Sequence, residues 1–226
     1  MAAAAQGKTN WFAIGISIAV VVVLVVLGAV VVWLNNQATD AGPAPQGDII
    51  NAETGAISFG EGDKVVDTYV DLMCPACGAF EQTFSERLRT LAEDDSITLN
   101  VHPIAILDHL SQGTDYSSRA AAAVYCVAET APEATLDYLA LLYANQPQEN
   151  TAGLTDDQLS AYAAEVGADA AAGCVADGKY LKYPAAQAQA HDIKGTPTIE
   201  LDGARVEGQT LQEIFTQVDQ YLSSVE

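Results

Sequence analysis

Two cysteines separated by two residues constrain the fold of this chain more than any other feature. Cys74-Pro75-Ala76-Cys77 follows a strand-like run over residues 65–72 and precedes a helix-like run that extends to about Leu91. The first turn of a helix carries unpaired N–H groups and the positive end of the helix dipole, which favour a thiolate over a thiol. Pro75 suits the first helical position, where no N–H donor is needed. We therefore predict a reactive pair in which Cys74 is acidic and exposed and Cys77 lies behind it.

Two other interpretations of this spacing are less favoured. A structural zinc site would need two more ligands at close spacing. The other cysteines lie far apart, however, and the histidines form no ligand pair (Cys126, Cys174, His102, His109, His191). A purely structural disulfide across two residues would be strained and easily reduced, which is a property of catalytic bridges. We expect no metal site.

An apolar segment near the N-terminus predicts a membrane anchor. Residues 11–34 form an uncharged run of 24 residues, with Trp11 and Trp33 near its two ends. At about 1.5 Å per residue, such a helix exceeds the roughly 30 Å hydrocarbon core of a bilayer. The apolar region of a cleaved signal peptide would be only about 7 to 15 residues long. Because residues 35–38 also make a poor cleavage site, we favour an uncleaved anchor.

The charges that flank this segment predict its orientation. Lys8 precedes the run, and no Lys or Arg occurs between the run and Lys64. Positive charge stays on the cytoplasmic side, so we expect residues 1–10 in the cytoplasm and the main domain outside the cell membrane. That compartment permits disulfides. With Cys74 and Cys77 as the reactive pair, Cys126 and Cys174 are left to form a structural bridge, although two free buried thiols are the alternative.

The net charge excludes one class of function. The chain has 9 Lys and Arg against 30 Asp and Glu, a formal net charge of −21. Such a field repels nucleic acids and anionic lipid headgroups. We therefore expect no nucleic-acid partner, and the acidity itself identifies no substrate.

The organisation of the chain indicates one main domain after a linker. Residues 35–47 are polar with Pro and Gly, which is typical of a tether, and the domain covers 48–226. Residues 49–59 suggest a hairpin or an edge strand. A second strand is predicted over 96–107, and together with the strand over 65–72 and the intervening helix it indicates a parallel β-α-β unit.

A helical insertion follows the β-α-β unit. From about residue 114 to residue 191 the chain is rich in Ala, Leu and Tyr at helical spacing. Thr155 and Gln158 have the spacing of a capping box at the start of one of these helices. The chain then returns to a strand at Thr198–Leu201, turns at Asp202-Gly203, and ends in a helix from about Leu211 to Leu222.

Three features together resemble the thioredoxin-like DsbA family of thiol:disulfide oxidoreductases. They are the Cys74–Cys77 motif after a strand, the helical insertion, and Gly195-Thr196-Pro197-Thr198 just before a late strand. The stretches 71–77 and 116–128 look most like the membrane-anchored actinobacterial members. The resemblance covers about residues 50–225 and implies an α/β, thioredoxin-like fold with a helical insertion. It also implies that Pro197 is a cis-proline beside the reactive pair, so that Thr196, Pro197, Pro75 and Ala76 support the active site.

The sequence departs from the family at two positions. Many members carry a buried carboxylate six residues before the first cysteine, thought to help move the proton of the second cysteine, but here that position is Thr68. Neighbouring Asp67 and Asp71 should point to the opposite face, so neither is a clear replacement. Ala76 stands where the best-known oxidases and isomerases have His, which implies a less acidic Cys74 and a less oxidising couple.

The resemblance implies an extracytoplasmic oxidase that introduces disulfides into exported proteins. It implies no bound cofactor; the partners would be reduced exported proteins and a quinone-linked membrane protein, in actinobacteria typically a vitamin K epoxide reductase homologue. Two alternatives remain open. One is a membrane-anchored reductase, for example in cytochrome maturation, and the other is a non-catalytic surface binding module that keeps the same fold.

Overall fold

The structure is a computed structural model that describes residues 11–38 and 41–225. The chain divides into two compact units, Met1–Asp40 and Ala41–Glu226, and each is described by itself. The segment predicted to be cytoplasmic, residues 1–10, lies outside the described residues.

The described residues of the first unit form one long helix. Helix α1 covers Trp11–Ala38, 28 residues, and its described apolar side chains are exposed over Val20–Leu27. The helix continues four residues beyond the predicted anchor and into the predicted linker, because residues 35–38 contain no Gly or Pro to end it. Over the part of the chain that the structure describes, no helix meets the length and apolar character needed to cross a membrane.

The second unit is built on a mixed sheet with the strand order β1-β2-β4-β3-β5-β6. Its strands are β1 (Ile50–Asn51), β2 (Ala56–Phe59), β3 (Lys64–Val70), β4 (Ile97–Pro103), β5 (Thr198–Leu201) and β6 (Ala204–Arg205). β3 pairs with β4 in parallel and with β5 in antiparallel, and β2 pairs with β4 in antiparallel. The predicted hairpins are present as β1-β2 and β5-β6. The predicted β-α-β unit is present as β3-α2-β4, with α2 covering Pro75–Glu93.

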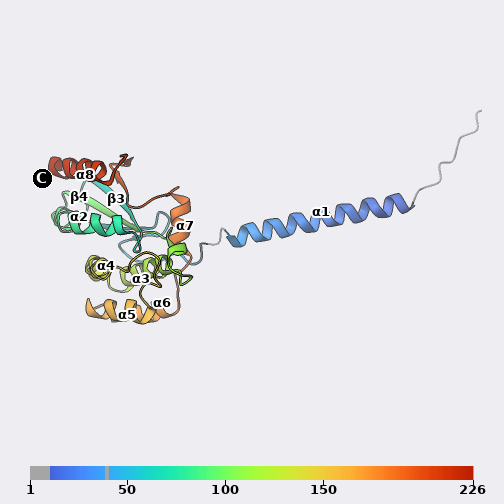
Figure 1. Cartoon of the computed structure of the whole chain (residues 1–226), viewed down its shortest axis with the longest axis horizontal. Coiled ribbons are helices and arrows are strands. Elements are labelled where there is room, and N and C mark those ends of the chain that lie inside the picture. The colour runs from blue at the N-terminus through green and yellow to red at the C-terminus, as the bar shows by residue number, and fades with distance from the viewer. Residues whose placement is uncertain (1–10, 39–40, 226) are drawn as a thin grey trace, which may run out of the picture. The chain divides into compact units, whose positions relative to one another are not determined.

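The two faces of the sheet pack against different helices. Val66 and Val70 of β3 belong to the main core, together with buried residues of α2 and of the C-terminal helix α8 (Leu211–Val225). The intervening Tyr69 packs instead with Ala188 of α7 (Tyr183–Ala190) in a small second cluster. Alternating side chains of a strand point to opposite faces, so α2 and α8 cover one face and α7 covers the other (Figure 1).

The helical insertion lies between β4 and β5, and its helices α3 to α6 form a layer of their own beside the sheet (Figure 1). It contains α3 (Tyr116–Thr130), α4 (Thr135–Ala144), α5 (Asp156–Glu165), α6 (Ala172–Ala176) and α7, with short 3-10 turns at Asp108–Leu110, Pro132–Ala134 and Asp169–Ala171. Helix α3 is buried along almost its whole length because small alanines let its neighbours approach closely. The capping box predicted at Thr155 and Gln158 starts α5, with both reciprocal hydrogen bonds formed.

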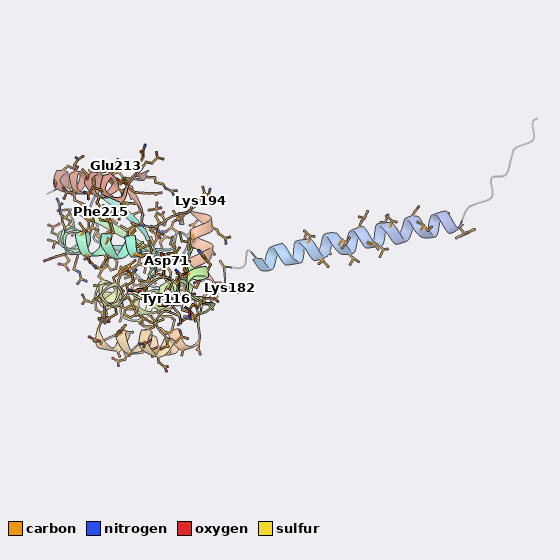
Figure 2. The ribbon with its side chains drawn as sticks, in the orientation of Figure 1. Asp71, Tyr116, Lys182, Lys194, Glu213 and Phe215 are labelled. Carbon is orange, nitrogen blue, oxygen red and sulfur yellow. A yellow bond between two sulfur atoms is a disulfide. The ribbon has the colours of Figure 1, made fainter. Side chains whose placement is uncertain are left out.

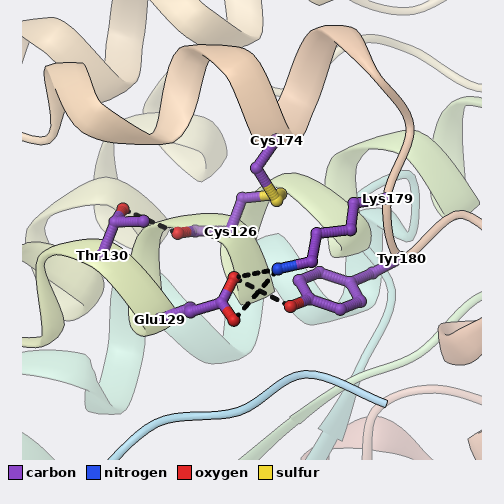
Figure 3. Close-up of a disulfide and its surroundings, with 6 residues drawn as sticks. All are labelled: Cys126, Glu129, Thr130, Cys174, Lys179 and Tyr180. Carbon is purple, nitrogen blue, oxygen red and sulfur yellow. Dashed lines mark hydrogen bonds and ion pairs between the residues drawn. A yellow bond between two sulfur atoms is a disulfide. The ribbon is translucent and has the colours of Figure 1, made fainter. Parts of the chain in front are cut away.

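A disulfide joins two helices of the insertion. Cys126 of α3 and Cys174 of α6 are bonded, with a Cα–Cα distance of 5.7 Å (Figure 3). Beside it, the Glu129 carboxylate accepts hydrogen bonds from Lys179 Nζ and from Tyr180 Oη, each at 2.8 Å. The covalent bond and these charged contacts connect the same two segments, so they fix the outer helices to α3.

Candidate active site

The reactive-pair motif starts α2 directly after the central strand. Cys74 is the N-cap residue in an extended conformation, and Pro75 takes up the first helical turn, as its missing N–H predicts. The Cys74 carbonyl accepts the backbone N–H groups of Cys77 and Gly78 at 3.1 and 3.2 Å. The two sulfurs are not bonded to each other. Both cysteines therefore lie at the positive end of the α2 dipole.

The predicted exposure of Cys74 is wrong. Only 6% of Cys74 is accessible and Cys77 is fully buried, whereas Pro75 is exposed and Ala76 half-buried. The cover comes from a loop distant in the sequence: Cys74 Sγ donates a hydrogen bond to the Thr196 carbonyl at 3.2 Å. The Thr196–Pro197 bond that follows is cis, as the resemblance implies. The motif thus presents only an edge of Cys74 to a substrate.

The surroundings of Cys74 favour its thiolate. A hydrogen bond from the Cys77 thiol lowers the pKa of Cys74 from 9.0 to about 6, aided by Thr196 and by the backbone N–H groups of Cys77 and Ala76, while burial acts in the opposite direction. Hydrogen bonds to the charged form of a group stabilise that form. Cys74 is therefore largely ionised at neutral pH, as a nucleophile or a leaving group in disulfide exchange requires.

Cys77 has the opposite character. Burial raises the pKa of the Cys77 thiol well above its ordinary value, and the hydrogen bond and the negative charge of Cys74 raise it further. The two sulfurs consequently share one proton, which stays on Cys77 while Cys74 carries the charge. Any reaction that makes Cys77 a nucleophile or a leaving group must move a proton to or from a buried atom.

An amide from the insertion holds the motif in place, and no sequence pattern predicts this role. Gln146, just after α4, donates hydrogen bonds from Nε2 to the Leu72 and Cys74 carbonyls at 3.1 and 2.9 Å. A Cβ on Gly78 would lie 2.5 Å from Gln146 Oε1. The glycine after the second cysteine thus leaves room for the amide that fixes the first.

Asp71 organises the turn before the motif and was also missed as a site residue. It lies in the interior of the domain close to Tyr116 (Figure 2) and is fully buried. Its oxygens accept hydrogen bonds from Met73 N, Ser117 Oγ, Ile106 N and Leu107 N, at 2.7 to 3.0 Å. Burial raises the pKa of Asp71 and these donors lower it. With four donors, the carboxylate acts as a structural hub that joins the motif to the loop after β4 and to α3.

The neighbouring polar residues of β3 follow the predicted alternation. Thr68 is buried on the side of α2, and Asp67 contacts His102 on β4, with 2.9 Å between Asp67 Oδ1 and His102 Nε2. His191 is half-buried beside Tyr69, with 3.2 Å between His191 Nδ1 and Tyr69 Oη.

An open groove borders the cis-proline loop. It has a volume of about 470 Å³ and is lined by residues of the loop, of β6 and of the segment after it (Gly195, Thr196, Pro197, Thr198, Arg205, Val206, Glu207, Gly208, Ile214). Thr196 contributes both to this groove and to the contact with Cys74. A chain lying in the groove would therefore reach the sulfur.

The fold and this site define a class: a thioredoxin-like domain with a paired-thiol centre at a helix N-terminus beside a cis-proline. The sequence-family profile described as Thioredoxin matches residues 57–220, and the chain belongs to that family. Within it, the chain is a DsbA-like protein, related to the DsbA of Mycobacterium tuberculosis.

Solved structures and curated sequences give the extent of these likenesses. The oxidised DsbA of Mycobacterium tuberculosis is 30% identical, with a TM-score of 0.64 over 74% of this chain and 92% of that chain. MdbA of Corynebacterium diphtheriae is 24% identical and shares the fold, with a TM-score of 0.65 over 82% of this chain and 99% of that one. The serine/threonine-protein kinase PknE of M. tuberculosis is 34% identical over 129 residues, 53% of this chain. This chain spans about a quarter of the kinase, since 23% of the kinase is covered.

Proposed function

We propose that this protein is a dithiol oxidase that introduces disulfides into exported proteins through Cys74 and Cys77. The observation that carries the proposal is the difference between the two thiols, with the pKa of Cys74 lowered to about 6 and that of Cys77 raised. A stabilised thiolate favours the reduced form of the pair, so the oxidised form gives its disulfide away readily. The relationship to the DsbA and MdbA oxidoreductases supports the same chemistry.

The reaction follows from the burial of the two sulfurs. A substrate thiolate attacks Cys74 Sγ, the sulfur with an accessible edge, and the Cys74–Cys77 bond breaks with its electron pair passing to Cys77. A second substrate thiolate then attacks the substrate sulfur of the mixed disulfide. Cys74 leaves as a thiolate, the substrate holds a new disulfide, and the enzyme is left reduced. The low pKa of Cys74 makes it the better leaving group of the two.

The groove beside Thr196 is the proposed substrate site. Its volume of about 470 Å³ suits an extended chain, and it is lined by the exposed Gly195 and the half-buried Thr196. An extended peptide can add to such a backbone by main-chain hydrogen bonds with little regard to sequence. Substrates of varied sequence are what a general oxidase must accept.

The cellular location and the re-oxidation partner are further parts of the proposal. The uncharged run over residues 11–34 and the basic Lys8 before it support an anchor with the catalytic domain outside the membrane. The resemblance supports a quinone-linked membrane partner, such as a vitamin K epoxide reductase homologue, that accepts the electrons. The location rests on the sequence and on the disulfide chemistry, which suits an oxidising compartment.

The reduction potential of the Cys74–Cys77 couple tests the direction of the proposed activity. The full chain in mild detergent is equilibrated with glutathione buffers, and the same preparation is assayed for oxidation of a reduced, unfolded test protein. A potential near or above about −180 mV together with oxidation of the test protein supports the oxidase. A potential near about −270 mV, the thioredoxin range, would make the protein a reductase and overturn the proposal. Thiols that resist alkylation altogether would indicate a binding module.

A further inference from the structure

A cavity lies on the other side of α2 from the substrate groove. It has a volume of about 200 Å³ and is bounded by α2, by β3 and β4, and by α4, with mostly apolar walls (Thr68, Val70, Phe80, Glu81, Ser85, Glu86, Leu88, Arg89, Leu99, Val101, Leu136, Leu139, Ala140). The exposed Glu86 and the half-buried Arg89 line the part nearest to solvent. A space of this size can hold several water molecules, and the polar groups on its walls can bind them.

One carboxyl group lines this cavity from α2 in the half-buried part of the helix. Glu81 comes four residues after Cys77, so the two side chains lie on the same face of the helix, one turn apart. The phenol of Tyr143, on α4, is within electrostatic reach of both Cys77 and Glu81. Among the described residues, the Glu81 carboxyl has no hydrogen-bond partner in the protein, so its oxygens are available to water or to a proton.

The charged and titratable groups around Glu81 come from two elements. On α2 they are Arg89, whose positive charge acts on Glu81, and the exposed Glu86. From α4, Tyr143 faces Glu81, while Asp137 binds Arg89 with 2.6 Å between Oδ1 and Nη1. Among the strand residues that line the cavity, the one polar side chain is that of Thr68, which is neutral. Arg89 is thus partly neutralised by Asp137, and it does not form a hydrogen-bonded pair with Glu81.

Asp71, the other buried carboxyl group near the motif, already accepts hydrogen bonds from the protein. Asp71 accepts four hydrogen bonds from its own turn, from the loop after β4 and from α3. Protonating it would break at least one of these bonds, because a protonated oxygen becomes a donor. Thr68, at the position where related proteins have a carboxylate, lines the same cavity as Glu81 but cannot exchange a proton near neutral pH. Apart from the exposed Glu86 at the mouth, the carboxyl that lines the cavity is that of the half-buried Glu81, and it is contributed by the helix and not by the strand.

We propose that Glu81 gives a proton to Cys77, one helical turn before it, when the disulfide opens and takes it back when the disulfide closes, with the cavity connecting Glu81 to solvent. This inference rests on the disulfide exchange of the proposed function and adds a residue to it. Attack of a substrate thiolate forms the new S–S bond to Cys74 and sends the electron pair to Cys77 Sγ. The carboxyl proton of Glu81 then neutralises that sulfur, and Glu81 recovers a proton from water at the cavity mouth.

The pKa values of Glu81 and Cys77 suit the transfer of a proton from the carboxyl group to the sulfur. Burial raises the pKa of Glu81 from 4.5 to about 7, although Arg89 opposes this. Burial also raises the pKa of Cys77, so Cys77 holds a proton more strongly than Glu81 does. A carboxyl with a pKa near the working pH can both donate and accept, which is what a proton carrier requires. Below about pH 7 the group is mostly protonated and ready to donate; above it, the donor is lost.

The pH dependence of disulfide opening tests the proposal. The oxidised full chain in mild detergent is mixed with glutathione, and the reaction is stopped by acid and followed by the mass of the mixed disulfide. Each rate constant is divided by the fraction of glutathione present as thiolate. In the wild type this corrected constant should fall as the pH rises through about 7. Glu81→Gln keeps the shape of the side chain and removes the proton, so it should abolish this inflection and lower the corrected constant about a hundredfold at pH 6.

Two further variants separate proton transfer from other effects. Glu93→Gln makes the same change of charge at the exposed end of α2, outside the cavity, and should leave the profile unchanged. Glu81→Asp keeps a carboxyl in the cavity and should restore the inflection. An inflection that persists in Glu81→Gln, or that is lost equally in Glu93→Gln, would overturn the proposal.

The same preparations distinguish this proposal from the proposed function. A wild type that reacts with glutathione and shows the Glu81-dependent inflection, but does not oxidise a reduced test protein, would overturn the oxidase and support the role of Glu81. If the wild type oxidises the test protein but its pH profile of disulfide opening is the same as that of Glu81→Gln, the oxidase would be supported and the role of Glu81 overturned.

Discussion

The domain holds two pairs of cysteines in opposite situations. The reactive pair, Cys74 and Cys77, is separated by two residues, starts a helix and is unbonded. The bridge pair, Cys126 and Cys174, is separated by 48 positions, joins two helices of the insertion and is closed. The reactive pair is surrounded by donors that stabilise a thiolate. The bridge pair adjoins a carboxylate that is already held by Lys179 and Tyr180.

The difference shows that the surroundings decide what a cysteine pair does. Hydrogen bonds from the Cys77 thiol, from the Thr196 side chain and from N–H groups at a helix terminus stabilise the Cys74 thiolate and make that sulfur a leaving group. A long closed loop reduces the entropy of the unfolded chain and makes the other pair a structural restraint. The reactive pair lies at the start of α2 and the bridge pair lies in the helical insertion, so each pair can be altered without the other.

The largest effect is expected on activity, which should depend on the reactive pair and not on the bridge pair. Cys74→Ser should abolish oxidation of a reduced test protein, because serine cannot form the mixed disulfide. The double variant Cys126→Ser/Cys174→Ser should retain most of the activity, assayed at a temperature where it is folded. Residual oxidation by Cys74→Ser, measured by alkylation of the test protein, would mean that the bridge pair also exchanges.

The next effect separates the pairs by stability. Removing the bridge with Cys126→Ala/Cys174→Ala should lower the free energy of unfolding by about 4 kcal/mol in the chain-entropy model, given a sequence separation of 48 residues. Denaturant unfolding followed by far-ultraviolet circular dichroism measures the loss. Cys77→Ala serves as the control for removing a buried sulfur, since it opens no closed loop when the reactive pair is reduced. An equal loss in the control would remove the distinction.

The pH dependence of alkylation sharpens the comparison for the reactive pair. With a pKa of about 6, Cys74 should be alkylated half-maximally near pH 6, and at pH 7 its thiolate fraction should exceed that of an ordinary cysteine about a hundredfold. Because this pKa lies below the unfolded value of 9.0, ionisation stabilises the reduced fold fully above about pH 9. That contribution is lost as the pH falls through about 6. Mass spectrometry of trapped Cys74 gives the profile, and a midpoint near pH 9 would contradict the assigned surroundings.

The smallest effect tests the amide that connects the insertion to the reactive pair. Gln146→Ala removes two hydrogen bonds to the Leu72 and Cys74 carbonyls and should lower the free energy of unfolding by about 1 to 2 kcal/mol. We also expect slower disulfide exchange, because the turn that carries Cys74 loses a fixed partner. Asn145→Ala, the exposed neighbour that bonds only within its own helix, is the matched control. Equal exchange rates in the two variants would show that the amide does not position the turn.

Much of the fold could be predicted because its signals are local. The alternation over 64–70, the proline at the start of α2 and the capping box at Thr155 depend on neighbours within a few residues. The hairpins follow from short turns such as Asp202-Gly203. Strand β3 nevertheless ends at Val70, two residues before the predicted end, because Asp71 turns away to bind distant donors.

The details of the site could not be predicted because they depend on contacts between distant segments. The cover over Cys74 comes from Thr196, 122 positions later, and the amide of Gln146 comes from 72 positions later. The interaction of Asp71 with Ser117 spans 46 positions. Contacts between residues so far apart leave no periodic pattern in the sequence. From the sequence alone, Gln146 therefore cannot be distinguished from other polar residues near the end of a helix. Of the site, only the position of Cys74 and Cys77 at the start of a helix could be predicted from the neighbouring residues.

The close approach of Gly78 to Gln146 has an evolutionary consequence. A methyl group at residue 78 would lie 2.5 Å from Oε1, and the amide could move away only by releasing the two carbonyls that it holds. We therefore expect the two positions to covary: a lineage that acquires alanine after the second cysteine should shift or shorten the residue at 146, or secure the turn by another donor. In an alignment of descendants of this chain, that correlation would connect the helical insertion to the thioredoxin-like core, two parts that could otherwise diverge independently.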